Sequence, residues 1–249
     1  MAKHLIPHTI QYPETAPFGA VRLVRPDYYV DGPTTHAQIF HGIEAAQLVR
    51  DAWLQSAWLA DTLGNEKVEQ LANQKDRMAD LERQVRRSLI HAAHRKHHAG
   101  WFALRAGTDE HTPGAVMGVA LAKHDVSGNL AERTYKQLFR PDKVYACVSD
   151  VDVDPDEQGS GVGMALFDAS LASFAPDKVP TTFVLGRNTR LILKLGELGF
   201  EQTGVQLRTD LLGADMPLPE TRMQGDSIQA VRERLAQAFP WLADAEVEY

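Results

Sequence analysis

The sequence predicts a mixed α/β fold, in which one mixed sheet carries helices on its faces. Two stretches, Ile43–Leu63 and Asn65 to about His98, place apolar residues three and four apart, which is the spacing of amphipathic helices. From Gly100 onward the pattern changes to short apolar runs typical of strands, with helical segments between them. No segment repeats with a fixed period, so a solenoid is excluded.

Composition narrows the class of protein. The chain has 249 residues, of which 44% are hydrophobic, enough for one large domain with a core of its own. Its 26 basic and 33 acidic residues give a net charge of −7, which argues against a nucleic-acid partner. The longest apolar run is far shorter than the roughly 20 residues that span a bilayer. With a single cysteine and no apolar leader, we expect a cytoplasmic protein without a membrane partner.

The first half of the chain predicts one strand and two helices. Met1–Gly19 contains three prolines and is expected to be irregular. Ala20–Arg25 alternates apolar and basic residues before Pro26, as a short strand does. The first helix is expected to stop at Gly64, and Asn65 can cap the second. We therefore divide the chain into an N-terminal arm (1–20), a main domain (21–210) and a C-terminal helical extension (211–249).

The second half predicts strands that alternate with shorter helices, because runs rich in β-branched and aromatic residues are separated by capped periodic segments. Asp125–Asp142 is polar and is expected to be a loop, with a helical turn around Glu132–Leu138. Leu211–Gly225 contains prolines and is expected to be a connection. The predicted strands are Trp101–Ala106, Ala115–His124, Val144–Val153, Thr181–Leu185 and Phe200–Asp210, and the helices are Gly161–Phe174, Thr189–Leu198 and Ser227–Ala238.

The most informative stretch runs from Val151 to Leu166. A strand ends at Asp154-Pro155, and three alternate glycines then open a helix. Glycines let backbone N–H groups converge without a Cβ in the way, and a helix N-terminus adds unpaired donors and partial positive charge. The pattern predicts a phosphate-binding loop.

Other readings of this loop are less well supported. No Gly-Lys-Ser/Thr follows, so it is not a P-loop. The glycines are spaced G-x-G-x-G, and the next strand ends at Gly186-Arg187-Asn188 without the acidic residue of a dinucleotide site. Arg187 could still meet a 2′-phosphate, so a dinucleotide stays open, as does a glycine-rich turn without a ligand.

Two motifs in this order resemble the GCN5-related N-acetyltransferase (GNAT) superfamily. The first is the signature loop, and the second is an Asn that stands eleven residues before a Gly-Phe pair. The resemblance covers roughly 21–210, with specific motifs only between 144 and 200. The residues that carry it are Val151, Val153, Pro155, Gln158, Gly159, Gly161, Gly163, Asn188, Gly199 and Phe200.

The resemblance implies the GNAT fold, a central and mostly antiparallel sheet that is splayed at a bulge and flanked by helices. It implies acetyl-CoA as acyl donor, with the pyrophosphate on the loop and the pantetheine arm along the splayed strand. No metal is expected, and a homodimer is possible. The donor-binding residues implied are Val151, Val153, Gln158, Gly159, Ser160, Gly161, Val162, Gly163 and Asn188.

The resemblance also implies direct attack of a primary amine, of a small molecule or a protein, on the thioester. Asp150 and Asp152 are candidates for the general base, although ion pairing at a strand edge would also explain them. A backbone N–H near Val153 can stabilise the oxyanion. Leu195 stands where the family often has a tyrosine acid. This departure supports an alternative, a GNAT-fold protein that binds acyl-CoA without efficient turnover.

Several residues have two interpretations. Tyr28, Tyr29 and Tyr145 could replace the missing acid, and Tyr28, Tyr29, Phe40 and Trp53 could line an acceptor pocket, but packing explains each of them as well. Cys147 fits a buried apolar position better than a nucleophile. His91, His94 and His98 share a helical face that suits a metal, but Arg95 and Lys96 would repel a cation, and cations are favoured at a helix C-terminus.

Overall fold

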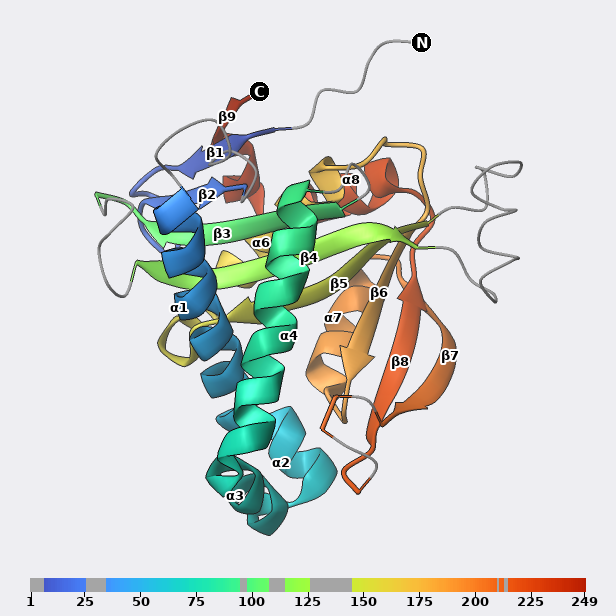
Figure 1. The fold of residues 1–249 in the computed structure, drawn as a ribbon. Helices are drawn as coiled ribbons and strands as arrows, with labels where there is room; N and C mark the ends of the chain where they lie inside the picture. The colour runs from blue at the N-terminus through green and yellow to red at the C-terminus, as the bar shows by residue number, and fades with distance from the viewer. Residues whose placement is uncertain are drawn as a thin grey trace.

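The computed structural model describes residues 7–25, 35–94, 98–107, 115–125, 145–209, 211–212 and 215–249, with side chains described except at 35–41, 90–94, 98 and 125. In these residues the chain forms one nine-stranded sheet with the order β7-β8-β6-β5-β4-β3-β2-β1-β9 (Figure 1). All neighbouring strands are antiparallel except β5 and β6. The strands are β1 (Thr9–Tyr12), β2 (Val21–Val24), β3 (His98–Arg105), β4 (Val116–Asp125), β5 (Tyr145–Val153), β6 (Pro180–Leu185), β7 (Glu201–Arg208), β8 (Leu218–Gln224) and β9 (Glu246–Glu248).

Helices cover both faces of the sheet. Helices α1 and α4 lie side by side across one face, and α6 lies against β3, β4 and β5 on the other, with α8 packed on it (Figure 1). The helices are α1 (Thr35–Leu54), α2 (Ala57–Leu63), α3 (Asn65–Asn73), α4 (Lys75–His94), α6 (Val162–Ala172), α7 (Thr189–Glu197) and α8 (Ile228–Ala238), with 3-10 turns η3 (Pro155–Glu157) and η4 (Pro240–Asp244). None of the helices in the described ranges is long and apolar enough to cross a bilayer.

The structure confirms the mixed, mostly antiparallel sheet and most predicted elements within a few residues. The two long helices, however, are each broken. The first ends at Leu54, and Ser56 caps α2 by accepting a hydrogen bond from the Leu59 N–H, because a serine hydroxyl competes well for the free donors of a helix start. The second breaks at Gln74, and its N-cap is Gly64 rather than Asn65. These breaks fold the segment into a corner at one end of the sheet.

Three strands were not predicted, namely β1, β8 and β9. Strand β1 (Thr9–Tyr12) lies in the arm expected to be irregular, where it pairs with both β2 and β9. Leu218–Gln224 lies in the expected connection, where β8 inserts between β6 and β7. These strands are short or rich in polar residues, so their pairing partners rather than their own sequences define them. The predicted loop Asp125–Asp142 and its turn at Glu132–Leu138 lie almost wholly outside the described residues.

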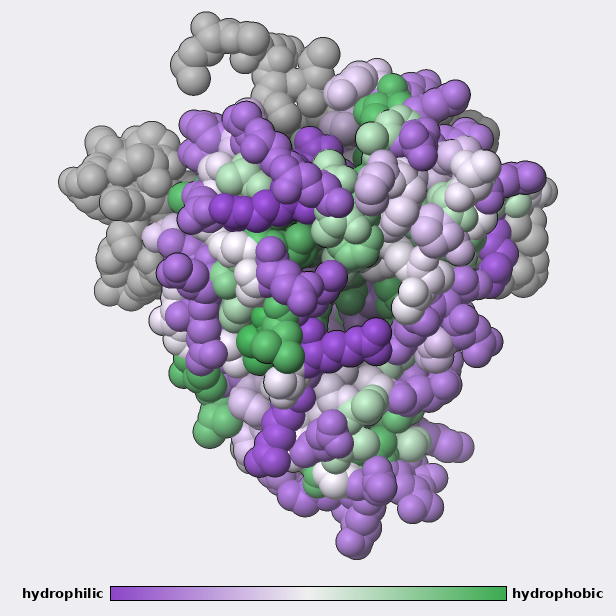
Figure 2. Space-filling model, turned by 180° about the vertical axis from the view of Figure 1, so that it is seen from behind, coloured by the Kyte–Doolittle hydropathy of each residue, from purple (hydrophilic) through white to green (hydrophobic). Residues whose placement is uncertain are grey.

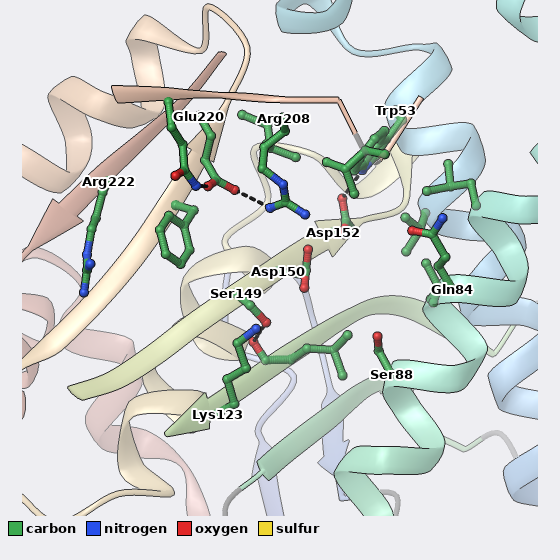
Figure 3. Close-up of a pocket in the computed structure, with 18 of the residues that line it drawn as sticks. Trp53, Gln84, Ser88, Lys123, Ser149, Asp150, Asp152, Arg208, Glu220 and Arg222 are labelled. Atoms are coloured by element: carbon green, nitrogen blue, oxygen red, sulfur yellow. Dashed lines mark hydrogen bonds and ion pairs between the residues drawn. The ribbon is translucent and has the colours of Figure 1, made fainter. Parts of the chain in front are cut away.

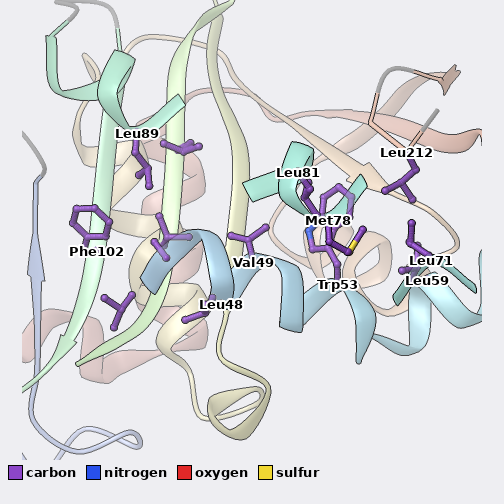
Figure 4. Close-up of a cluster of buried hydrophobic side chains, with 14 of the residues drawn as sticks. Leu48, Val49, Trp53, Leu59, Leu71, Met78, Leu81, Leu89, Phe102 and Leu212 are labelled. Carbon is purple, nitrogen blue, oxygen red and sulfur yellow. The ribbon is translucent and has the colours of Figure 1, made fainter. Parts of the chain in front are cut away.

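Strand β3 shows how the core is divided between the two faces. Phe102 and Leu104 pack beneath α1 and α4 (Figure 4), whereas Trp101 and Ala103 face α6. All four are at most 1% exposed. Both faces of this strand are therefore buried, which explains why its sequence is continuously apolar rather than alternating.

The face that carries α6 and α8 is largely hydrophilic at its surface and is hollowed near its centre (Figure 2). An ion pair fastens these two helices together. Asp168 of α6 is 8% exposed, and both its oxygens accept hydrogen bonds from Arg232 of α8, at 2.7 and 3.0 Å. Burial raises the pKa of Tyr12 in β1, and the negative charge of the Asp168 carboxylate raises it further. The negative charge of the buried Asp168 carboxylate is therefore compensated by Arg232.

We predict that Arg232→Met lowers the free energy of unfolding by about 2–3 kcal/mol, because Asp168 would be left charged and unpaired in the core. Urea denaturation measures this. The double variant Asp168→Asn/Arg232→Met should recover more than half of the loss, since no charge remains to be buried. Equal stability of Arg232→Met and the unchanged protein would contradict a structural role for the pair.

Candidate active site

A β-bulge interrupts the pairing of β4 with β5 near the middle of the sheet. Asp150 pairs with Leu121, and the next pair joins Val148 to Ala122, so Ser149 is an extra residue in β5. The Ser149 hydroxyl donates a hydrogen bond to the Leu121 carbonyl at 3.1 Å, which fixes the bulge. Such a residue bends its strand and increases the local twist.

Beyond the bulge, β5 separates from β6. The two strands pair only between 146–148 and 180–182, and Thr182 Oγ1 donates to the Val148 carbonyl at 2.8 Å where the pairing ends. Further along, the strands line opposite walls of a cavity of about 220 Å³, which we call the slot. The slot is lined by Trp53, Trp58, Ser149–Val153, Gly163, Met164, Phe167, Thr182–Leu185, Asn188, Leu191 and Leu195. The splay that the sequence motifs implied is present.

The backbone of β5 presents polar groups to the slot. The Asp154 N–H donates to the Met117 carbonyl across β4, at 2.9 Å. Because backbone groups alternate sides along a strand, those of Val153 and Val151 face the slot. The Val153 carbonyl accepts a long hydrogen bond, 3.4 Å, from the side chain of Gln158. This strand edge can therefore pair with an extended guest chain.

The glycine-rich loop closes one end of the slot. Gly159 and Gly161 have φ angles of 86° and 113°, which favour glycine. Within the described chain, the backbone N–H groups of Gly159, Gly161 and Gly163 donate to no protein acceptor. A Cβ on Gly163 would lie 3.4 Å from Val153 Cγ2, which is an ordinary van der Waals contact, so this position can hold a side chain. Three unpartnered amides at a helix N-terminus fit a pyrophosphate.

Both ends of the chain support this loop. A Cβ on Gly161 would lie 3.1 Å from the Trp241 ring and 3.3 Å from the Phe18 ring. The Phe18 and Trp241 rings meet edge to face, with centroids 5.1 Å apart, and Tyr12 of β1 contacts both. The loop is held from behind by aromatic side chains outside the region that the sequence motifs cover.

A second, larger cavity of about 810 Å³ lies on the α1 and α4 side of the sheet (Figure 3). It shares several lining residues with the slot, among them Trp53, Asp150 and Asp152. Since side chains alternate along β5, Asp150 and Asp152 point to this cavity, while Val151 and Val153 point toward α6. The two carboxyl groups therefore stand where the two cavities meet.

The surroundings shift the two carboxyl groups differently. Burial, followed by the negative charge of Asp150, raises the pKa of Asp152 to about 7, although the Trp53 indole donates a hydrogen bond to it at 3.1 Å. Burial also raises the pKa of Asp150, but the Ser149 hydroxyl, Lys123 and Arg208 oppose that rise. Burial thus raises the pKa of both carboxyl groups, and that of Asp152 lies near neutral pH.

The wall formed by β4, β7 and β8 carries charged residues that the sequence motifs did not indicate. Glu220 is 3% exposed and accepts hydrogen bonds from Gln206 and from Arg208, the latter at 2.6 Å. Lys123 and Arg222 also line the cavity. Because β8 was not predicted, nothing in the sequence brought Glu220 and Arg222 to this site. The segment 218–224 (LPETRMQ) does not alternate apolar and polar residues, so it carries no strand pattern of its own.

The remaining candidates lie as follows. Leu195 is 2% exposed in the slot wall, and no tyrosine lines either cavity in the ranges that the structure describes. The Arg222 guanidinium lies over the ring of Tyr145, with its central carbon 5.3 Å from the ring centroid. Cys147 is fully buried. Asn188 lines the slot and caps α7 by accepting from the Leu191 N–H at 3.1 Å.

Some candidates fall outside the described side chains, namely Tyr28, Tyr29, Phe40, His91, His94 and His98. Of the last three, α4 contains His91 and His94, whereas His98 begins β3, so they do not share one helix as expected. Among the side chains that are described, no group of His, Cys, Asp and Glu could hold a metal ion.

No protein-family profile matches the sequence, and no curated protein matches it. Among solved structures, an uncharacterised protein from Bacillus halodurans aligns over 97% of this chain and 99% of its own, with 12% identity and a TM-score of 0.51. A protein from Corynebacterium glutamicum titled histone acetyltransferase HPA2 and related acetyltransferase aligns over 76% and 92%, with 17% identity and a TM-score of 0.47.

Nourseothricin acetyltransferase aligns over 51% of this chain and 64% of its own, with 20% identity and a TM-score of 0.35. The chain thus spans less than two thirds of that protein's length.

Three features of the structure characterise the fold: the mostly antiparallel sheet, the bulge where β5 separates from β6, and the glycine loop at the start of α6. Together they define a GNAT fold, which confirms the resemblance at the level of the fold.

The electrostatics of Asp152 predict a cost in stability. Its pKa is about 7 in the folded chain against an ordinary value of 3.8, so folding favours the protonated form and stability falls as pH rises between these values. Asp152→Asn should therefore have a higher free energy of unfolding than the unchanged protein at pH 8, by at most about 4 kcal/mol as measured by urea denaturation, and the two should converge near pH 4. Asp177→Asn, at an exposed turn, is the control. An advantage of equal size at both pH values would contradict the raised pKa.

Proposed function

We propose that the protein is an N-acetyltransferase that moves an acetyl group from acetyl-CoA to a primary amine by direct attack. The observation that carries this proposal is the meeting of two cavities at Asp150 and Asp152. One cavity is a narrow slot with a phosphate-binding loop at its end, and the other is broad and lined with charge. Two separate entrances to one reaction point suit a donor and an acceptor that meet without a covalent enzyme intermediate.

The chain's own groups fit the donor. The free amides of Gly159, Gly161 and Gly163 would bind the pyrophosphate. The N–H groups of Gln158, Ser160 and Val162 already donate to acceptors within the loop, so these residues would border the pyrophosphate without donating to it. Val151 and Val153 would pair with the pantetheine arm through their slot-facing backbone groups. Asn188 would border the arm from α7. When bound, acetyl-CoA supplies the activated acetyl carbonyl.

Asp152 is the better placed of the two candidate bases. An amine enters as an ammonium and must lose a proton before its nitrogen can bond to the acetyl carbon and the carbon–sulfur bond can break. A carboxyl group with a pKa of about 7 is charged in a large fraction of molecules at neutral pH and is a stronger base than an ordinary aspartate. The Trp53 indole fixes its orientation by donating to Oδ1. Asp150 supplies the neighbouring charge that makes Asp152 more basic.

Two further tasks fall to other groups. The Val153 N–H faces the slot and would stabilise the oxygen that becomes negative during attack. For the departing thiolate, Leu195 offers no proton. A thiol has an ordinary pKa near 8.5, so the thiolate can leave near neutral pH and take its proton from water.

The burial of Leu195 in the slot wall specifically favours a second candidate function, that of an acyl-CoA-binding protein without efficient turnover. Release of free thiol from acetyl-CoA in the presence of a panel of amines separates the two. An enzyme releases thiol in proportion to acetylated amine, whereas a binder shows saturable binding of CoA and no release.

The phosphate-binding loop predicts a charge-specific loss of donor binding. Gly163→Asp puts a carboxylate at the start of α6, where the helix dipole stabilises it while its charge repels a pyrophosphate. Affinity for CoA, measured by calorimetry, should fall at least about 100-fold without loss of thermal stability. Gly163→Asn is the control of equal size, and it should retain most of the affinity that Gly163→Asp loses. Equal affinities of the two variants would count against a pyrophosphate at this loop.

The base predicts a pH profile. The kcat/KM for acetylation should rise with pH through about 7, because Asp152 must be ionised to accept a proton. Asp152→Asn should lower kcat/KM by about 10²–10⁴-fold and abolish that limb. Asp150→Asn should instead move the limb to lower pH, since a neighbouring negative charge is removed. A limb at the same pH in both variants would exclude these residues from proton transfer.

A further inference from the structure

The larger cavity is polarised along the ladder of β4 and β5. On its floor Asp152 pairs with Val119, Asp150 with Leu121, and Cys147 with Lys123. The side chains of Val119, Leu121 and Lys123 project to the same face, since they are two residues apart, and all three line the cavity. Two carboxyl groups therefore lie at the end next to the slot, and an ammonium group follows further along.

Strand geometry gives the length of this charge separation. Two residues advance about 7 Å along a strand, so Lys123 stands about 7 Å beyond the position opposite Asp150 and about 13 Å beyond that opposite Asp152. Figure 3 shows the same arrangement, with Lys123 on the side of the cavity away from Trp53 and Asp152. A molecule that reaches from the slot to this end must be elongated.

The far end of the cavity is cationic. Arg222 of β8 lines the same cavity, with its guanidinium 5.8 Å from the centroid of the Phe183 ring. No carboxylate in the described part of the chain lies within 4.0 Å of the Lys123 ammonium. Glu220, the other acid of this wall, is paired with Arg208. Lys123 thus forms no ion pair within 4.0 Å in the described residues, although its charge acts on Asp150 and lowers the pKa of that carboxyl group.

We propose that the acceptor is an elongated primary amine whose far end carries a carboxylate, the simplest case being a lysine-type amino acid acetylated on its side-chain amine. This rests on the proposed function. The amine would lie between Asp150 and Asp152 beside the thioester, and the carboxylate would lie at Lys123 and Arg222. The position midway between Asp150 and Asp152 stands about 10 Å along the strand from Lys123. The six bonds between the two groups of lysine span about 7 Å when extended, and the long Lys123 side chain can cover the remainder.

The same polarity selects against other amines. A diamine or polyamine of equal length would place an ammonium against Lys123 and Arg222, where like charges repel, without the carboxylate that compensates the α-ammonium of lysine. A short α-amino acid could not reach both ends at once. The cavity thus discriminates by the sign of the charge at the far end, and a pair of substrates that differ only in that charge tests it.

The experiment compares L-lysine with cadaverine, which has the same chain and amine but no carboxylate. Thiol release from acetyl-CoA gives kcat/KM for each amine. The unchanged protein should prefer lysine by at least about tenfold, chiefly through KM. Lys123→Met should reduce the ratio of the lysine to the cadaverine value by at least about tenfold. Because an indirect effect of Lys123 on Asp150 would act on both amines, the ratio isolates the carboxylate contact. Lys67→Met, on exposed α3, is the control and should keep the ratio.

Binding provides an arm that does not need turnover. Calorimetry should show lysine binding that weakens at least about tenfold in Lys123→Met but not in Lys67→Met. If acetyl-CoA releases no thiol with either amine while lysine binding depends on Lys123, the proposed enzyme is wrong but this inference holds. If cadaverine equals or exceeds lysine in turnover, or if lysine binds equally to both variants, the inference is overturned whatever the outcome for acetyl transfer.

Discussion

The candidate site depends on one irregular residue in the middle of the sheet. The pairing of β5 with β6 ends at Val148, next to the extra residue Ser149, and the slot opens beyond that point. The bulge also sets which side chains face which layer, because the residues after it alternate between the α6 side and the α1 and α4 side. The backbone groups that face the slot and the carboxyl groups that face the larger cavity thus come from the same five-residue segment of one strand.

The separation of the two sides has an electrostatic consequence. The slot is lined mainly by apolar side chains, whereas the larger cavity gathers three acids and three bases from β4, β5, β7 and β8. Burial at their boundary makes a carboxyl group basic enough to accept a proton, at the expense of folding stability. A loss of folding stability of this kind is expected at positions where the residue is selected for function rather than for packing.

The parts of the site that the sequence could predict are those encoded in contiguous residues. The glycine loop and the end of β5 follow from local backbone chemistry, so the spacing of their residues indicated them. Asn188, which caps α7, was indicated by the resemblance to the GNAT superfamily. Lys123 and Arg222 come from other elements and reach the site only through long-range strand pairing. Trp53 was named as a possible pocket residue and does line both cavities, but its hydrogen bond to Asp152 depends on helix packing. The strand β8 itself is defined by its neighbours. The boundaries proposed for the domains, at 20 and 210, and a homodimer remain predictions.

The aromatic contacts next to Gly161 connect the N-terminal and C-terminal parts of the chain to the glycine loop. Phe18 follows β1, Trp241 lies in η4 just before β9, and β1 and β9 pair at the outer edge of the sheet. Fraying of that edge would therefore be transmitted to the peptide planes of the loop, although no residue of the edge contacts the slot. Affinity for a diphosphate would then report on the integrity of a border several strands away.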